Sequence, residues 1–111
     1  MATLTIVKQS KPSAATLTDI YTVTAASNAV VSSIIVANQS ATATSFRISV
    51  APAGAADATS QYLYYDIPIG GNDTFVATIG FALNGVTTQD IVRVYNTLAT
   101  CSFTLFTREV S

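Results

Sequence analysis

Apolar and polar residues alternate along most of this chain with a period of two, which is the period of β-strands. The clearest case is the segment 45–50, where Phe46, Ile48 and Val50 occupy every second position. Residues that favour turns, mainly Gly, Pro, Asn and Ser, separate the alternating segments, and no segment keeps a helical period. The pattern predicts about eight short strands, over residues 3–7, 17–23, 29–37, 45–50, 61–69, 74–79, 91–95 and 100–108.

One of these predicted strands differs from the others. The run 29–37 carries apolar residues on both parities, which is typical of a strand that is covered on both faces. We therefore expect this segment at the centre of a sheet. Regularly spaced strands with no helices between them indicate a β-sandwich or a barrel.

The predicted fold class is all-β: a single-domain β-sandwich of antiparallel strands, either jelly-roll or immunoglobulin-like. We expect the sandwich over residues 13–111 and an N-terminal arm or edge strand over residues 1–12. The inward positions of the strands give the expected core, which is Val30, Ile34, Val36, Phe46, Ile48, Val50, Ile67, Phe75, Ile79, Val92, Val94, Phe103 and Leu105.

Composition adds that charge is scarce. Only 10% of the residues are charged, against about 25% in a typical soluble domain, and the chain has no histidine. Histidine is the usual general base near neutral pH, and the carboxylates here are scattered singly, so we expect no enzyme, no metal site and no cofactor. The net charge of −1 gives no attraction to nucleic acid. No apolar run approaches the roughly 20 residues of a membrane span.

The start of the chain and its one cysteine indicate where the protein is made. Segment 1–12 lacks a basic start followed by a long apolar stretch, so it does not resemble a secretion signal, and we expect synthesis in a cytoplasm. The single Cys101 has no partner for an internal disulfide. Because it lies in a strand-like run, we expect a buried, inert thiol.

Three tyrosines, Tyr62, Tyr64 and Tyr65, form the most suggestive local cluster. Exposed aromatic rings with polar tips are enriched in protein interfaces and in sugar-binding sites. A purely structural alternative places Tyr65 in the core and the other two tyrosines under a loop. A sugar site would need an open aromatic platform flanked by Asp66 or Asn72, and the absence of Trp counts against it.

Four stretches of the sequence have a familiar succession: LTDIYTV, AVVSSIIVANQSATATSFRISVAPAGA, QYLYYDIPIGGNDTFVATIGFAL and DIVRVYNTLATCSFTLF. Together they resemble a group of small β-rich virion proteins of tailed bacteriophages, and the resemblance covers residues 17–110. It includes no catalytic motif. What it implies is a structural role in the phage particle, in particular that of a capsid decoration (cement) protein that binds and stabilises the assembled shell.

The resemblance also implies partners and a location. The expected partners are the major capsid protein or other virion proteins, and the expected location is the virion, after synthesis in the bacterial host cytoplasm. A shell protein at quasi-threefold positions would suit a symmetric homo-oligomer, namely a trimer. The alternative function is a tail or surface-fibre adhesion module that binds a host receptor or a glycan.

Attachment to such a particle is not expected to rest on charge, because the basic residues form no cluster. Close-packed apolar and small polar contacts, or added β-strand pairing, are expected instead. The N-terminal segment 2–11 is the part most free to reach a neighbour. The expected interface residues are Tyr62, Tyr64 and Asp66 in one group and Thr3, Leu4 and Ile6 in the other.

Overall fold

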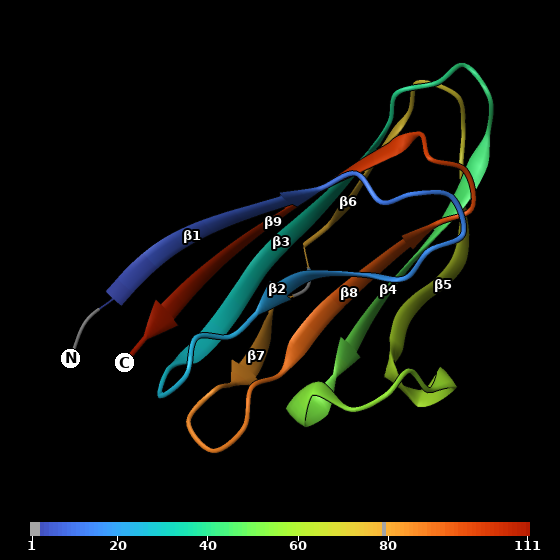
Figure 1. Cartoon of the computed structure of the whole chain (residues 1–111). Coiled ribbons are helices and arrows are strands. Elements are labelled where there is room, and N and C mark those ends of the chain that lie inside the picture. The colour runs from blue at the N-terminus through green and yellow to red at the C-terminus, as the bar shows by residue number, and fades with distance from the viewer. Residues whose placement is uncertain (1–2, 79) are drawn as a thin grey trace.

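A computed structural model describes residues 3–78 and 80–111 and shows two packed β-sheets (Figure 1). Two short 3-10 turns, η1 (Pro52–Gly54) and η2 (Thr59–Gln61), lie in the connection from the fourth strand to the fifth. No helix within the described residues is long and apolar enough to cross a membrane. The strands are β1 (Thr3–Ser10), β2 (Thr18–Thr22), β3 (Asn28–Asn38), β4 (Thr44–Ala51), β5 (Tyr62–Ile69), β6 (Thr74–Ala77), β7 (Phe81–Asn84), β8 (Ile91–Asn96) and β9 (Cys101–Val110).

The strands pair as they do in a jelly roll. One sheet has the order β1-β9-β3-β6, with β7 also paired to β3, and the other has the order β2-β8-β4-β5. Every pair is antiparallel. The first strand pairs with the last, the second with the next to last, and so on inward, as in a long hairpin rolled into two layers. The predicted all-β sandwich is confirmed, and its strand order is that of the jelly roll.

β6 and β7 share one position in this roll, because both pair with β3. Residues 34–37 of β3 lie opposite β6, and residues 28–31 lie opposite β7. The strand predicted over 74–79 ends at Ala77, and β7 was not predicted because its four residues are too few to show alternation. The roll therefore has a broken strand at one edge of its five-stranded sheet.

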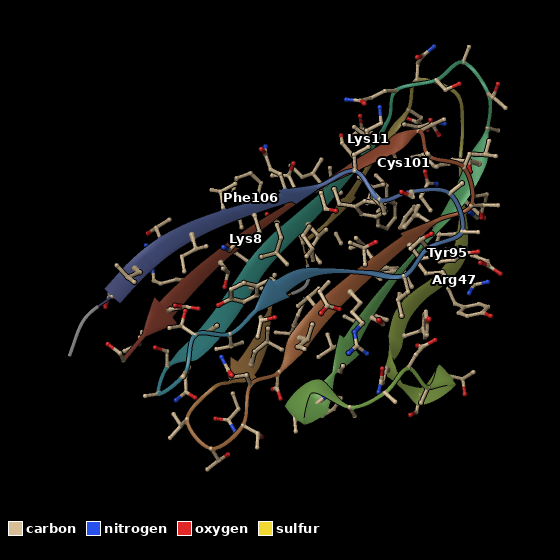
Figure 2. The ribbon with its side chains drawn as sticks, viewed as in Figure 1. Lys8, Lys11, Arg47, Tyr95, Cys101 and Phe106 are labelled. Atoms are coloured by element: carbon tan, nitrogen blue, oxygen red, sulfur yellow. The ribbon has the colours of Figure 1, made fainter. Side chains whose placement is uncertain are left out.

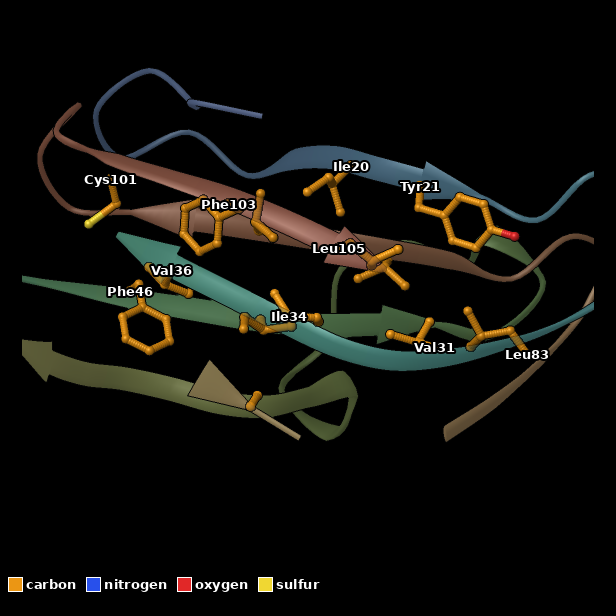
Figure 3. Packing of buried hydrophobic residues seen from close by; sticks show 14 of the residues in the cluster. Ile20, Tyr21, Val31, Ile34, Val36, Phe46, Leu83, Cys101, Phe103 and Leu105 are labelled. Carbon is orange, nitrogen blue, oxygen red and sulfur yellow. The ribbon is translucent and has the colours of Figure 1, made fainter. Parts of the chain in front are cut away.

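The core lies between the two sheets (Figure 3). Half-buried side chains that pack against it include Val50, Ile67 and Phe75, all three of them expected core residues. Ile79, also expected there, lies outside the described residues. The predicted core residues that are fully buried are Ile34, Val36, Phe46, Ile48, Val92, Val94, Phe103 and Leu105.

The expectation for Val30 is wrong. Its side chain is 54% exposed, whereas Ala29 and Val31 are buried. The pairing of β3 with β9 shifts register between Val31 and Ser33, so Ser32 is the extra residue of a β-bulge. Inward positions are odd-numbered before the bulge and even-numbered after it. The apolar residues on both parities of 29–37 thus reflect a change of phase, although β3 does lie at the centre of its sheet.

Two buried polar side chains tie strands together across the fold. The amide of Asn96 accepts hydrogen bonds from the backbone N–H groups of Thr100 and Cys101 and donates one to the carbonyl of Ser45. Asn96 thereby fixes the β8–β9 turn against β4. The carboxylate of Glu109 makes a second tie, which joins β9 to β2 and to the turn that follows β2.

Candidate interaction surfaces

The outer face of the β2-β8-β4-β5 sheet carries a cluster built around Arg47. Its Nε lies 2.6 Å from Oδ1 of Asp66, and its Nη2 donates a second hydrogen bond of 3.3 Å to Oδ2. The guanidinium carbon lies 4.2 Å from the ring centre of Tyr65 and 4.3 Å from that of Tyr95. Figure 2 labels Arg47 and Tyr95. The hydrogen bond with Asp66 raises the pKa of Arg47 above its ordinary value. A two-point carboxylate contact and two aromatic contacts hold this arginine in one place.

Tyr62 completes the cluster, which we call the Arg47 cluster (Arg47, Tyr62, Tyr65, Asp66 and Tyr95). The rings of Tyr62 and Tyr65 meet edge to face, with their centres 5.0 Å apart. Burial and a hydrogen bond with the Asp57 carboxylate raise the pKa of Tyr62 above its ordinary value. Two residues named from the sequence, Tyr62 and Asp66, are therefore brought together on one outer face.

A bulge in β5 explains why Tyr65 and Asp66 both reach this face. The register of β4 and β5 shifts between the pairs Phe46–Ile67 and Ile48–Tyr64, which leaves Tyr65 and Asp66 together opposite Arg47. Asp66 has a φ of +50°, in the left-handed region that some bulges use.

The same bulge decides which of two tyrosines is buried. Tyr64 is half-buried, and its ring packs edge to face on Phe75 with the ring centres 5.3 Å apart. Tyr65, the proposed core residue of the structural alternative, is 51% exposed. Simple alternation along 61–69 puts Tyr65 on the inward side, because it does not count the extra residue.

The outer face of the β1-β9-β3-β6 sheet is different, because it mixes apolar with small polar side chains and is nearly without charge. We call it the five-stranded outer face. Val30 and Val76 project from it with exposures of 54% and 52%. Phe106 of β9, labelled in Figure 2, lies opposite Val7 of β1 and Ser33 of β3. A depression of about 280 Å³ on this face is lined by Thr5, Val30, Ser32, Phe106, Thr107 and Arg108. The outward residues are Thr3, Thr5, Val7 and Gln9 of β1, Ser102, Thr104, Phe106, Arg108 and Val110 of β9, Asn28, Val30, Ser33, Ile35 and Ala37 of β3, Thr74 and Val76 of β6, and Ala82 and Asn84 of β7.

β1 places the second group of expected interface residues at the edge of this sheet. Thr3 lies opposite Val110 and faces outward, whereas Leu4 and Ile6 lie opposite the inward residues Glu109 and Thr107. Leu4 is nevertheless 56% exposed and Ile6 is half-buried. The opposing sheet therefore leaves the inner side of β1 largely open.

Glu109 carries a buried carboxylate whose pKa is shifted in the folded chain. Burial by itself would raise its pKa, but hydrogen bonds to one oxygen from the Tyr21 hydroxyl and from the backbone N–H and hydroxyl of Thr24 outweigh burial and lower the pKa.

Burial raises the pKa of the Cys101 thiol, which is fully buried as predicted. Within residues 3–78 and 80–111, no three His, Cys, Asp or Glu side chains group so as to hold a metal ion.

No known protein family and no curated protein matches this chain by sequence. The fold does match a solved structure described as "Bacillus endospore appendages form a novel family of disulfide-linked pili". The match has a TM-score of 0.58 at 13% sequence identity, and it covers 99% of this chain and 87% of that chain. At this identity the likeness is one of fold, and the resemblance to phage virion proteins stays a prediction.

Proposed function

We propose that this chain is a non-enzymatic structural subunit of a bacteriophage virion, and in particular a decoration protein that binds and stabilises the capsid shell. The observation that carries the proposal is the five-stranded outer face. It presents exposed valines among Ser, Thr, Asn and Ala side chains, with Arg108 as its charged residue among those described. Small polar and β-branched side chains lose little conformational entropy when a partner covers them.

The energetics of this face suit many weak contacts on a lattice. Full burial of a valine side chain is worth about 1.5–3 kcal/mol, so covering the half-exposed Val30 or Val76 contributes about 1 kcal/mol each. No single contact of this size would hold a monomer firmly. When several linked copies bind neighbouring sites on a shell, their overall affinity for the shell rises without any new kind of contact.

The Arg47 cluster is a second contact region on the opposite side of the sandwich. Interfaces are enriched in Arg and Tyr at their centres, and anchors that are already held in place bind with little ordering cost. A decoration protein with two such faces can touch the shell with one face and a neighbouring copy with the other. This arrangement supports an oligomer, and the trimer expected from shell geometry stays a prediction.

The test is occupancy on particles that lack the protein. Val76→Asp should lower occupancy several-fold, because it places a charge within the proposed dehydrated contact. Val86→Asp is the matched control, since Val86 is 57% exposed but lies in the loop between β7 and β8. Occupancy is measured by gel densitometry and by cryo-electron microscopy. Equal occupancy for the two variants and the unchanged chain would exclude the five-stranded outer face as the binding surface.

A filament subunit is the second candidate function, and the fold match to a pilus protein favours it. That structure's description refers to disulfide linkage, whereas the one cysteine of this chain is fully buried in β9. Filaments of this chain would therefore rest on non-covalent contacts. Electron microscopy of the concentrated protein distinguishes the candidates, because a decoration protein needs its shell in order to form an ordered array.

The adhesion alternative has weaker support. Tyr65 is exposed, but the Arg47 guanidinium lies over its ring, and Tyr62 meets its edge. A sugar stacks on an open aromatic face, so the cluster would have to open first. A glycan array that shows specific binding would nevertheless favour adhesion over decoration.

A further inference from the structure

The two sheets present several edges, and β5 is an edge that is closed to further pairing. Pro68 lies within it and has no N–H to donate, and Asp66 places a charge beside it. Its register with β4 also shifts twice, so its backbone does not offer an even row of hydrogen-bonding groups. These features are the usual means by which natural sheets prevent the addition of a foreign strand.

The edges at β2 and at β6 and β7 are also interrupted. β2 has only five residues, its register with β8 shifts between Asp19 and Tyr21, and Asp19 carries an exposed charge. β6 and β7 have four residues each and are separated, since β6 ends at Ala77 and β7 begins at Phe81. A second strand could follow either edge for a few residues at most.

β1 is the contrasting case. Its eight residues pair with β9 without a register shift, and they include neither Pro nor Gly. Alternate backbone N–H and C=O groups on its free edge point away from the sheet. Apolar side chains are exposed on both of its sides, with Leu4 at 56% and Val7 at 51%. A long, regular edge strand with exposed apolar side chains is a template for another strand.

We propose that β1 pairs antiparallel with β1 of a second copy of this chain, across a two-fold axis at Ile6. The occupant is a second copy because β1 is the open edge of the described fold, so two copies bring two identical open edges of eight residues together, and neither strand has to leave an existing sheet. The pairing joins the two five-stranded sheets into one continuous sheet. The proposed pairing describes the contact between two copies, and it does not depend on which larger assembly the subunit belongs to.

Symmetry and charge select the register. A two-fold axis perpendicular to the sheet keeps inward residues opposite inward residues, so the axis passes through one residue. Ile6 and Val7 are the two central residues of β1, and an axis at either of them gives the largest overlap of the two strands. With Ile6 on the axis, Lys8 lies opposite Leu4 of the second copy, and the two Lys8 residues are four positions apart, or about 14 Å. With Val7 on the axis, they are two positions apart, or about 7 Å, which is within the screening length of about 8 Å. The Ile6 register therefore separates the charges.

This register also covers apolar surface that the monomer leaves open. The methylene groups of Lys8 lie over Leu4 of the second copy, and the two Ile6 side chains meet at the axis. On the outer side, Val7 lies opposite Thr5 of the second copy, which is a pair of β-branched residues favourable in sheets.

Sedimentation equilibrium and light scattering of the purified chain should give a mass twice its 11.6 kDa. Three times that mass, as for the trimer expected from shell geometry, would count against the two-fold pairing. Ile6→Lys places two like charges opposite each other and should weaken the dimer at least about tenfold. Thr3→Lys is the matched control, because it adds the same charge opposite Gln9 of the second copy and should leave the dimer intact. An equimolar mixture of Ile6→Lys and Ile6→Glu should restore a dimer. A strict monomer for the unchanged chain at high concentration would overturn the proposal.

A crosslink tests the register without added charge. Ile6→Cys should form an interchain disulfide under mild oxidation, because directly opposite residues lie within disulfide reach. Cys101 is fully buried and does not compete. Faster crosslinking of Val7→Cys than of Ile6→Cys would overturn the proposed register. If the purified chain forms this dimer but does not bind capsids, the result supports the β1 pairing and contradicts the proposed decoration function.

Discussion

Removal of the Tyr21 hydroxyl by Tyr21→Phe should destabilise the fold by about 1.5–3 kcal/mol, the range for a hydrogen bond to a charged group. Tyr21 and Glu109 are 2% exposed each, and the Tyr21 hydroxyl donates to Oε2 of Glu109. The variant leaves a buried carboxylate with donors from Thr24 alone. For a domain of this size, the loss corresponds to a melting temperature lower by roughly 6–12 °C.

The pH dependence separates this mechanism from simple loss of packing. The pKa of Glu109 is lowered in the folded state, so its contribution is present above the unfolded pKa of about 4.3 and is lost as pH falls through the folded value. The difference between Tyr21→Phe and the unchanged chain should therefore be largest near pH 7 and should narrow below about pH 4.

The assay is urea unfolding monitored by tyrosine fluorescence and circular dichroism at several pH values. Tyr95→Phe is the control, because Tyr95 is a half-exposed tyrosine that contacts Arg47 through its ring. It should change the free energy of unfolding by no more than about 0.5 kcal/mol. An equal loss for Tyr21→Phe at pH 7 and pH 3, or no loss at all, would refute the role assigned to the Glu109 carboxylate.

Three further predictions use the same purified protein. Phe103→Ala should lower the free energy of unfolding by about 3–5 kcal/mol, whereas Val30→Ala should lower it by less than about 1 kcal/mol. Similar losses for the two variants would contradict the outward orientation of Val30 in β3. The Cys101 thiol should react with a thiol reagent only after unfolding, because it is fully buried and its pKa is raised, and rapid labelling of the native protein would contradict this. Occupancy on particles should change little between about 0.05 and 1 M salt, and steep loss at high salt would show that charge holds the protein in place.

Most strands could be predicted from alternation, because one buried face imposes a period of two wherever the strand is regular. Phe46, Ile48 and Val50 show this, as do Phe103 and Leu105. Errors arose where a strand carries an extra residue. Ser32 shifts the phase of β3, and single-sequence alternation contains no signal that distinguishes such a shift from burial on both faces.

The candidate surfaces were predictable only in part, for a related reason. Tyr62 and Asp66 were named from residue type, but Arg47 and Tyr95 join them through pairing of strands that are distant in the sequence. The burial of Glu109 depends on Tyr21 and Thr24, which are 88 and 85 residues away. Local sequence carries no information about such contacts. Knowledge of the strand order would have supplied the Arg47 contacts, because β4 lies between β5 and β8.

The number of open sheet edges determines how many neighbours one copy of this protein can join by strand pairing. Unlimited growth of a sheet requires two open edges per subunit, one to accept a strand and one to offer it. Among the described strands, β1 is open and the edges at β2, β5 and β6 are interrupted, so the proposed pairing joins each copy to one neighbour and growth by edge pairing stops at two. A surface rich in valine, serine and threonine can thus be held at high local concentration on an assembly without seeding an endless β-sheet.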